Sequence, residues 1–389
     1  MPYLRAMFST TQKIGILGGG QLGKMLCLAA APWDFKTCIL DTSADFPAGP
    51  VCAEFTPGDF NNYDDVLAFG ADKDVLTIEI EHVNTKALHE LKRQGKVIHP
   101  APEALDIIKD KGLQKEFYRE NGIPTAPFEL FDNEKALLDA IETGKWNLPL
   151  VQKSRTAGYD GKGVAILRTK EDLQTKLLQG PCLAEQLAPV QTEIAVIAAR
   201  NASGEVAVFP AVEMDFHPEA NLVELLVCPA RIPTLAAAEA ESLAEQVIRA
   251  FDVCGLLAVE MFLCTDGQLW VNEVAPRPHN SGHHTIDSAV TSQYQQHLRA
   301  ICNLPLGDTA QVQPALMLNL LGEDGHKGPV QYEGVAECLA VSGVHVHLYG
   351  KALTSPFRKM GHVTITAETL EAAFRKAEFV KKTLRVISR

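Results

Sequence analysis

The sequence lacks the features that mark several large classes of protein. No apolar run approaches the ~20 residues that a helix needs to cross a bilayer, so we expect no membrane span. Basic residues are in the minority, since 36 Lys and Arg stand against 48 Asp and Glu, for a net charge of -12. That balance argues against a broad nucleic-acid surface but allows a local basic pocket. The leader Met1–Gln12 has no apolar core of the secretory type.

Cysteine is present but is not organised into a framework. The nine cysteines are an odd number, are scattered and form no C-x-x-C pair. This pattern suggests neither a disulfide scaffold nor a zinc site. A reducing cytoplasm is therefore the expected compartment. The chain also has no internal repeat and no low-complexity segment.

What is present is an ordinary globular composition on a long chain. Hydrophobic residues make up 46% and charged residues 22% of the 389 residues. A chain of this length divides into two or three domains. The prolines of "HPAPEAL" mark one boundary. We predict domains at 1–102, 103–305 and 306–389, with a smaller subdomain at about 125–190.

The N-terminal part opens on "KIGILGGGQLGKM", which predicts a strand, a glycine turn and the start of a helix. Gly18, Gly20 and Gly23 fit G-x-G-x-x-G, and the next strand, "KTCILD", ends in Asp41, close to where a Rossmann fold places its ribose-binding acid. Further strands, "VLTIEI" and "KVIHP", alternate with helical segments, which predicts a parallel sheet wrapped by helices. A nicotinamide or flavin enzyme is one hypothesis from this motif.

Beyond residue 103 the pattern changes to helices followed by long strands. "TEIAVIAARN", "EVAVFPAVEM", "NLVELLV", "LAVEMFL" and "QLWVNEV" are strand-like, and a helix is expected from Ala236 to about Phe251. This layout predicts an α+β domain with antiparallel sheets. The tail from about Pro314 contains the short strands "ALMLNLL", "VHVHLYG" and "GHVTIT" before a final helix from Glu368.

A glycine-rich loop lies between two strands in "QKSRTAGYDGKGVAIL". Its glycines predict a mobile hairpin whose backbone N–H groups can close over phosphates. Lys153, at the end of the preceding strand, can serve as a point charge. No G-x-x-x-x-G-K-[ST] occurs, so this is not a Walker A loop. A flexible hairpin with a solvated lysine is the plainer alternative.

Two acids interrupt otherwise apolar strands. Glu260 in "VEMFL" and Glu273 in "WVNEV" are separated by a short turn, and a carboxylate buried there is expensive without a partner. Acids on adjacent strands can converge on Mg²⁺, which takes oxygen ligands and shares them with phosphates, and Asn272 offers a further oxygen. The alternative is that both acids point outward from half-exposed strands.

A dense polar run, "RPHNSGHH", follows the second of these strands. Such a loop after a buried strand is typical of a functional site, with Arg277 as a clamp for a phosphoryl oxygen and Asn280 and Ser281 as binders of oxyanions. Its three histidines are not spaced as a zinc site. Upstream, Glu185 and Glu193 flank a linker where a purine base can bond to main chain and Glu193 can take a ribose. Solvated acids are the alternative there.

Together, these motifs resemble the ATP-grasp superfamily and, within it, the N5-carboxyaminoimidazole ribonucleotide synthetases of purine biosynthesis. The resemblance covers nearly the whole chain and is carried by "GILGGGQLGKML", "TIEIEHV", "AGYDGKG", "VNEVAPRPHNSGHHTID" and "QYQQHLRAICNLPLG". It implies an ATP-grasp fold of α/β and α+β class, with an N-terminal Rossmann-like parallel-sheet domain, a central ATP-grasp domain with a lid and a small C-terminal β-rich domain. It also implies a ligase that converts ATP, bicarbonate and 5-aminoimidazole ribonucleotide to ADP, phosphate and the N5-carboxylated ribonucleotide.

The resemblance further implies roles for individual residues. The ATP contacts would be Lys111, Lys153, Gly158, Tyr159, Asp160, Gly161, Lys162, Gly163, Val164, Glu185, Gln186, Leu187, Ala188, Glu193, His217, Asn272 and Glu273. The Mg²⁺ ligands would be Glu260 and Glu273. The ribonucleotide contacts would be Gln21, Glu81, Tyr159, Asp160, Asn280, Ser281, Lys351 and Arg358, with catalytic roles for Asp160, Arg277 and Lys351. Two positions depart from the family, because Lys111 stands where arginine is usual and Val164 where glutamine is common.

Because the middle domain already carries an ATP site, we expect the opening glycine turn to line the substrate-binding side instead. We expect N–H groups at the start of its helix to attract an anion, and Gln21 to contact the ribonucleotide or bicarbonate beside Glu79 or Glu81. Asp41 then becomes an ordinary strand-end acid. Asp160 is expected to orient the reacting amine or to accept its proton.

Three other functions stay open. They are another ATP-grasp ligase, such as a formate-dependent glycinamide ribonucleotide formyltransferase, a nicotinamide oxidoreductase, and a nucleotide sensor without catalysis. For the leading hypothesis, the expected cofactors and partners are ATP, Mg²⁺, bicarbonate and 5-aminoimidazole ribonucleotide. We expect no nucleic acid and no membrane, and a homodimer in the cytoplasm.

Overall fold

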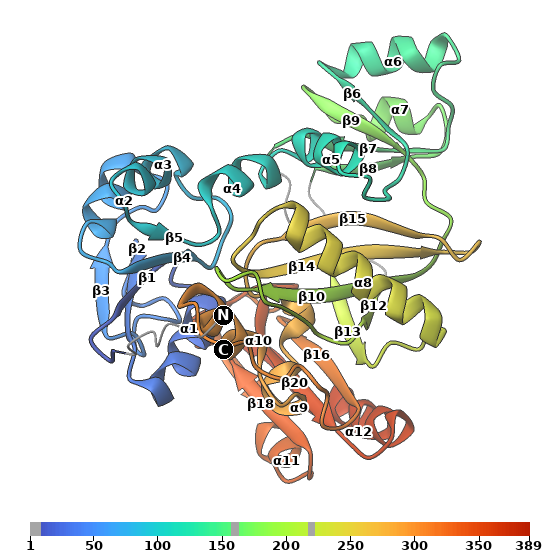
Figure 1. Ribbon diagram of the computed structural model, residues 1–389. Helices are drawn as coiled ribbons and strands as arrows, with labels where there is room; N and C mark the ends of the chain where they lie inside the picture. Colours follow the sequence, from blue (N-terminus) through green and yellow to red (C-terminus); the bar gives the residue numbers. More distant parts are fainter. Residues whose placement is uncertain (1–8, 157–162, 217–221) are drawn as a thin grey trace.

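The structure of the chain is a computed structural model that describes residues 9–156, 163–216 and 222–389. The strands of these residues form four sheets (Figure 1). The predicted site positions that lie outside the described residues are Gly158, Tyr159, Asp160, Gly161, Lys162 and His217.

The N-terminal sheet is parallel throughout, in the order β3-β2-β1-β4-β5. Its strands are β1 (Lys13–Leu17), β2 (Lys36–Asp41), β3 (Glu54–Pro57), β4 (Val75–Ile78) and β5 (Val97–Ile98). Its helices are α1 (Gln21–Ala30), α2 (Tyr63–Gly70) and α3 (Thr85–Arg93), with a 3-10 turn η1 (Ala31–Trp33) after α1. The apolar runs of β1 and β4 are buried because α1 packs on one face of the sheet and α2 and α3 pack on the other.

The glycine turn between β1 and α1 is held by two acids of the same domain. Asp41 accepts a hydrogen bond of 2.7 Å from the Gly19 N–H. The Glu79 carboxylate accepts bonds from the N–H groups of Gly20 (2.8 Å) and Gly23 (2.9 Å). The expectation that Asp41 is an ordinary strand-end acid is therefore wrong, because it fixes the turn. The anion at the start of α1 is in this structure a side chain of the protein itself.

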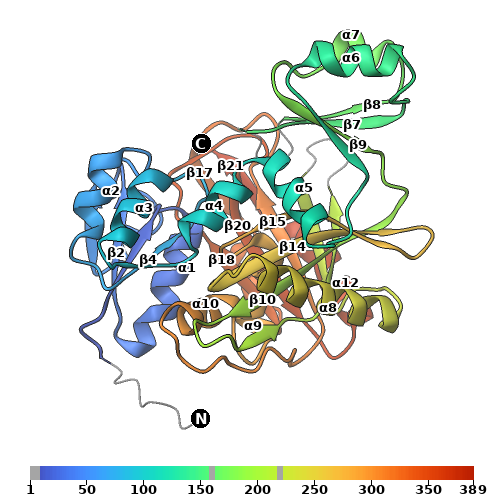
Figure 2. The ribbon, with the colours of Figure 1, turned by 45° about the horizontal axis from the view of Figure 1, so that its top comes forward.

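Two helices lead from this domain to a small antiparallel sheet. The helices are α4 (Pro102–Ile108) and α5 (Lys111–Glu120), and the strands are β6 (Phe128–Phe131), β7 (Leu150–Ser154), β8 (Val164–Leu167) and β9 (Cys182–Gln186). The strand order is β6-β9-β7-β8. The helices α6 (Glu134–Glu142) and α7 (Asp172–Thr175) cover its outer face (Figure 2). The other face of the small sheet points toward the large central sheet.

The central sheet has nine strands and is antiparallel, in the order β15-β14-β10-β12-β13-β16-β20-β18, with β11 paired to β10. Its strands are β10 (Val190–Arg200), β11 (Val206–Val208), β12 (Val212–Phe216), β13 (Val223–Cys228), β14 (Gly255–Cys264), β15 (Leu269–Ala275), β16 (Ala315–Leu321), β18 (Val344–Leu348) and β20 (Lys359–Thr366). The long helix α8 (Thr234–Ala250) packs on β10 and β14 through an apolar core. Since β16, β18 and β20 belong to this sheet, it runs across the predicted boundary at residues 305 and 306.

The C-terminal part adds a small antiparallel sheet and two helices. Its remaining elements are β17 (Gly328–Glu333), α11 (Val335–Leu339), β19 (Leu353–Thr354), α12 (Leu370–Thr383) and β21 (Arg385–Ser388). The helix α12 packs with β16 and β20 around a second apolar core. Within the described ranges, every helix is too short or too polar to cross a bilayer.

Three short elements join the central sheet to the N-terminal domain: η2 (Asn280–Gly282), α9 (Thr285–Ser288) and α10 (Gln293–Ile301). Tyr294 and Leu298 of α10 pack in one core with α1 and β1. His297 on the same helix bonds Thr77 of β4 at 2.8 Å. These contacts fix the N-terminal sheet beside the central one. The fold class predicted from the sequence is confirmed.

Several histidines are enclosed at these junctions and are held neutral. The His283 ring bonds the Tyr294 hydroxyl at 2.9 Å, and the His362 ring bonds the Tyr349 hydroxyl at 3.2 Å. Burial is the largest cause that lowers the pKa of six histidines: His99, His279, His283, His284, His297 and His362. A charged imidazole is disfavoured at each of these places.

Stability is therefore expected to fall as the pH drops below about 6.5. Unfolding returns the six histidines to an ordinary pKa near 6.5, so the unfolded chain binds more protons, and each histidine removes about 1.4 kcal/mol of stability per pH unit. Four acids with raised pKa values, Glu79, Glu193, Asp215 and Glu260, act in the opposite sense, but they are fewer than the six histidines. Urea unfolding at a series of pH values measures the trend.

A pair of variants makes this measurement specific. His297→Gln keeps a group that can bond Thr77 but cannot take up a proton. The free energy of unfolding should therefore fall less steeply with decreasing pH, by the contribution of one histidine. His82→Gln makes the same change at an exposed histidine and is the matched control. A free energy of unfolding that stays flat between about pH 7 and about pH 5 would contradict the assignment.

Candidate functional site

Three acids lie on three neighbouring strands of the central sheet. Glu260 on β14 is directly opposite Glu273 on β15, and Glu193 lies on β10, the next strand. Burial, together with Glu273 and Glu193, raises the pKa of Glu260 to about 8, and burial raises the pKa of Glu193 to about 7. These acids resist ionising together without a cation, which fits a site for a divalent ion. Within the described ranges, no three His, Cys, Asp or Glu side chains are grouped so as to hold a metal ion.

Lys111 brings a cation to these acids from the start of α5. Its ammonium contacts Glu273. Burial alone would raise the pKa of Glu273, but Lys111 outweighs it and holds that pKa at about 2. The helix begins here because Asp110 caps it, accepting a bond of 2.8 Å from the Gly112 N–H. Arg155, just after β7, pairs with Asp110 at 2.7 Å and so fixes the helix to the small sheet.

A buried ion triad joins the small sheet to α5 and β15. Lys153 on β7 lies 2.7 Å from the Glu185 carboxylate on β9, and Lys115 on α5 lies 2.8 Å from its other oxygen. Lys153 also donates to the Asn272 side-chain oxygen at 2.8 Å. The exposed fractions of Lys153, Glu185 and Lys115 are 7%, 3% and 2%. Burial would raise the pKa of Glu185, but the two lysines hold it at about 2.

Both oxygens of the Glu185 carboxylate are paired with lysines, so the contact predicted for this residue would be made by its main chain. A base at this linker would have to bond to main chain, and Gln186, Leu187 and Ala188 remain the predicted partners. The Gln186 N–H itself bonds to the Pro127 carbonyl at 2.9 Å. Gly163 and Val164 lie at the end of the glycine loop, and Val164 begins β8 opposite Lys153.

The predicted substrate side lies next to the acids. Arg277, in the loop after β15, pairs with Glu81, after β4, at 2.8 Å. His279 in the same loop lies 3.3 Å from Glu260. Gln21 is the first residue of α1, at the carboxyl edge of the parallel sheet where ligands of such folds bind. The structure thus places residues predicted to bind the substrate next to those predicted to bind the metal.

Asn280 and Ser281 stay predictions because both side chains have structural partners. The side-chain amides of Asn280 and Asn319 exchange hydrogen bonds of 2.9 and 3.0 Å. The Ser281 hydroxyl lies 2.9 Å from the His279 ring. A ribonucleotide contact by either residue would have to replace one of these bonds.

The two cations of the C-terminal loop lie on either side of β19. Lys351 donates to the Lys359 carbonyl at 2.7 Å and lies 5.5 Å above the Tyr349 ring. Arg358 is exposed and donates to the Leu353 carbonyl at 2.5 Å. Two such cations on one loop suit a phosphate, which is the role predicted for them.

Three charged residues near these positions have roles that the sequence did not reveal. Lys24 on α1 donates to the carbonyls of Leu348 and Tyr349, at 3.1 and 3.2 Å, and so links α1 to the chain just before Lys351. Glu79 holds the turn, and Lys115 completes the triad. Lys115 stands four residues after Lys111, so helical spacing could have indicated that both lie on one face.

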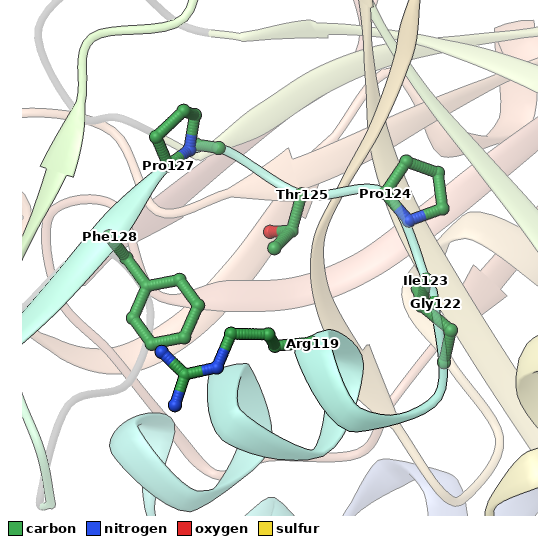
Figure 3. A pocket seen from close by; sticks show the side chains of 8 residues that line it. Arg119, Gly122, Ile123, Pro124, Thr125, Pro127 and Phe128 are labelled. Carbon is green, nitrogen blue, oxygen red and sulfur yellow. The ribbon is translucent and has the colours of Figure 1, made fainter.

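A cavity of about 470 Å³ opens where α5 leads into β6 (Figure 3). The Arg119 guanidinium lies 5.4 Å from the Phe128 ring, and a proline-rich turn at residues 122–127 forms the rest of the wall. None of the predicted site residues lines this cavity. Thr125 of its wall also contacts Lys115 of the buried triad.

Family models match three consecutive parts of the chain. The ribonucleotide synthetase preATP-grasp domain matches residues 11–109, the ATP-grasp domain matches residues 116–294, and the phosphoribosylaminoimidazole carboxylase C-terminal domain matches residues 315–376. The domain limits predicted from the sequence stay predictions.

Relatives match over nearly the whole chain. Phosphoribosylaminoimidazole carboxylase of Ogataea methanolica is 39% identical over 97% of this chain and 70% of its own length. Three further yeast carboxylases are covered over 66% of their length, so the chain spans about two thirds of these relatives. N5-carboxyaminoimidazole ribonucleotide synthase of Brucella melitensis is 38% identical over 90% of this chain and 95% of its own.

Solved structures agree with this likeness. The N5-carboxyaminoimidazole ribonucleotide synthetase of Thermotoga maritima has a TM-score of 0.89 and 40% identity, over 97% of this chain and all of its own. The synthase of Aspergillus clavatus, described in complex with ADP and 5-aminoimidazole ribonucleotide, has a TM-score of 0.87 and 32% identity, over 97% and 99%. The chain belongs to the N5-carboxyaminoimidazole ribonucleotide synthase family of ATP-grasp ligases.

Proposed function

We propose that this chain carboxylates 5-aminoimidazole ribonucleotide with bicarbonate at the expense of ATP, in purine biosynthesis. The products are N5-carboxyaminoimidazole ribonucleotide, ADP and phosphate. The observation that supports the proposal is that side chains suited to a nucleotide lie next to side chains suited to the second substrate. The acids and lysines suited to a nucleotide lie beside the Arg277–Glu81 pair at the edge of the N-terminal sheet.

The first chemical step joins two anions, so the site must neutralise charge. Bicarbonate attacks the γ-phosphorus of ATP and forms carboxyphosphate with release of ADP. Lys111, Lys153 and Arg277 would stabilise the charge that develops on the phosphoryl oxygens. Glu260 and Glu273 would hold Mg²⁺, which neutralises phosphate charge when it is bound.

The second step transfers the carboxyl group to the amine of the ribonucleotide. Lys351 and Arg358 would hold its phosphate, and Gln21, Glu81, Asn280 and Ser281 are the further proposed contacts. Asp160 and Tyr159, which lie outside the described residues, would orient the amine or accept its proton. Carboxyphosphate is short-lived in water, so the glycine loop at 158–164 would act as the lid.

Two further parts of the proposal concern the setting of the enzyme. A cytoplasmic location is supported by the nine cysteines, all of which are free thiols, seven of them buried. A homodimer is proposed from the family alone. The family models and relatives favour carboxylation over the formyltransferase, the oxidoreductase and the sensor considered from the sequence.

Release of phosphate from ATP should require bicarbonate and be stimulated by 5-aminoimidazole ribonucleotide. Formate should not replace bicarbonate, and glycinamide ribonucleotide should not replace the aminoimidazole, because the proposed site commits to one acid and one amine. A coupled phosphate assay on the purified chain, with each acid paired with each amine, measures this. Turnover that prefers formate with glycinamide ribonucleotide would support the formyltransferase instead.

Removing either proposed metal ligand should raise the Mg²⁺ requirement. Glu260→Gln and Glu273→Gln each remove one anionic oxygen donor, so the rate at fixed Mg²⁺ should fall on the order of 10²-fold. The rate as a function of Mg²⁺ concentration measures this. Glu245→Gln, on the solvent-exposed side of α8, makes the same change of charge as a control. Unaltered Mg²⁺ curves for both site variants would rule out these ligands.

A further inference from the structure

Lys115 is a fully enclosed charge next to the proposed nucleotide site. It is 2% exposed, and its ammonium lies 2.8 Å from Glu185. Its other contacts are the Thr125 hydroxyl, the Val271 carbonyl at 3.4 Å and the Tyr118 ring at 5.7 Å. Burial lowers its pKa, and the nearby ammonium groups of Lys153 and Lys111 lower that pKa further. A side chain held in this way is too deeply buried to touch a substrate, so any part that it takes in the reaction acts through Glu185.

The charges of the triad do not cancel. Two ammonium groups, of Lys115 and Lys153, share the one carboxylate of Glu185. Burial lowers the pKa of Lys115 to about 8, which leaves it mostly protonated at neutral pH, and the pKa of Glu185 is about 2. The triad therefore carries one net positive charge at a place where water is excluded and interactions between charges are strong.

We infer that Lys115 is a positioning residue of the nucleotide site, which balances Glu185 so that Lys153 keeps its positive charge for the phosphates of ATP. The inference rests on the proposed ATP-dependent function. Without Lys115, the carboxylate would neutralise Lys153 completely. The phosphates of ATP would then bind beside a neutral Lys153–Glu185 pair instead of beside a net positive charge.

A double-mutant cycle separates this role from simple packing. Lys115→Met removes the balancing cation, Glu185→Gln removes the carboxylate, and the double variant removes both while leaving Lys153 and the main chain of β9 in place. Lys135→Met, on the exposed surface of α6, is a matched loss of one lysine. The dissociation constants for ATP and ADP are measured by calorimetry, the melting temperature by circular dichroism, and KM for ATP and kcat by the phosphate assay.

Lys115→Met is expected to weaken ATP and ADP binding about tenfold, which corresponds to ~1.4 kcal/mol, and to raise KM for ATP more than it lowers kcat. The double variant should return within about threefold of the unmodified chain, because Lys153 again has no carboxylate to neutralise it. Glu185→Gln alone should bind ATP at least as tightly as the unmodified chain. Lys135→Met should change nothing.

Other outcomes have distinct meanings. A double variant that binds ATP as weakly as Lys115→Met overturns the role, as does full ATP affinity in Lys115→Met. If Lys115→Met does not fold, Glu185→Gln decides, because weakened nucleotide binding in that variant also overturns it. Failure of the unmodified chain to bind ATP is a different result, which refutes the proposed function itself.

Discussion

The elements around the site are joined at one carboxylate, that of Glu185, which is buried between two lysines. A charge enclosed in protein is stable only with partners, and here the partners come from different elements. Lys153 lies on β7, Lys115 on α5, and Lys153 extends the link to Asn272 on β15. The contact of Lys111 with Glu273 joins α5 to the same strand. Pairing these charges therefore fixes the small sheet, the helix and the central sheet as one unit.

The local elements could be predicted well because their signals are local. The strands "KTCILD" and "ALMLNLL" correspond to β2 and β16 residue for residue, and α1 begins at Gln21 as expected. Other segments differ for physical reasons. "EVAVFPAVEM" divides into β11 and β12 around Pro210, which cannot donate to the ladder. The strand β17 is a short run after Gly328 and Pro329 with only two core-facing apolar residues, Val330 and Tyr332. The continuation of the central sheet into β16 rests on distant partners, for which the sequence holds no signal.

For the site too, the sequence indicated which residue types matter but not which residues they pair with. Buried acids in apolar strands and a polar loop after them identified Glu260, Glu273 and Arg277 as candidates, and the structure brings these side chains into one region. Ion-pair geometry was beyond the sequence, because it depends on which elements meet. The helix-start anion predicted at the glycine turn is supplied by Glu79, 59 residues away from Gly20 along the chain. A local motif of this kind identifies a binding geometry but not its occupant.

In the proposed mechanism, the cations of the site let one anion, bicarbonate, attack another, ATP. An oxygen of bicarbonate then ends on the phosphate released from ATP. Incubation with ¹⁸O-labelled bicarbonate, ATP and 5-aminoimidazole ribonucleotide, followed by mass spectrometry of the phosphate, measures this most directly. We expect one labelled oxygen in each phosphate formed. Phosphate that takes its new oxygen from water would contradict this mechanism.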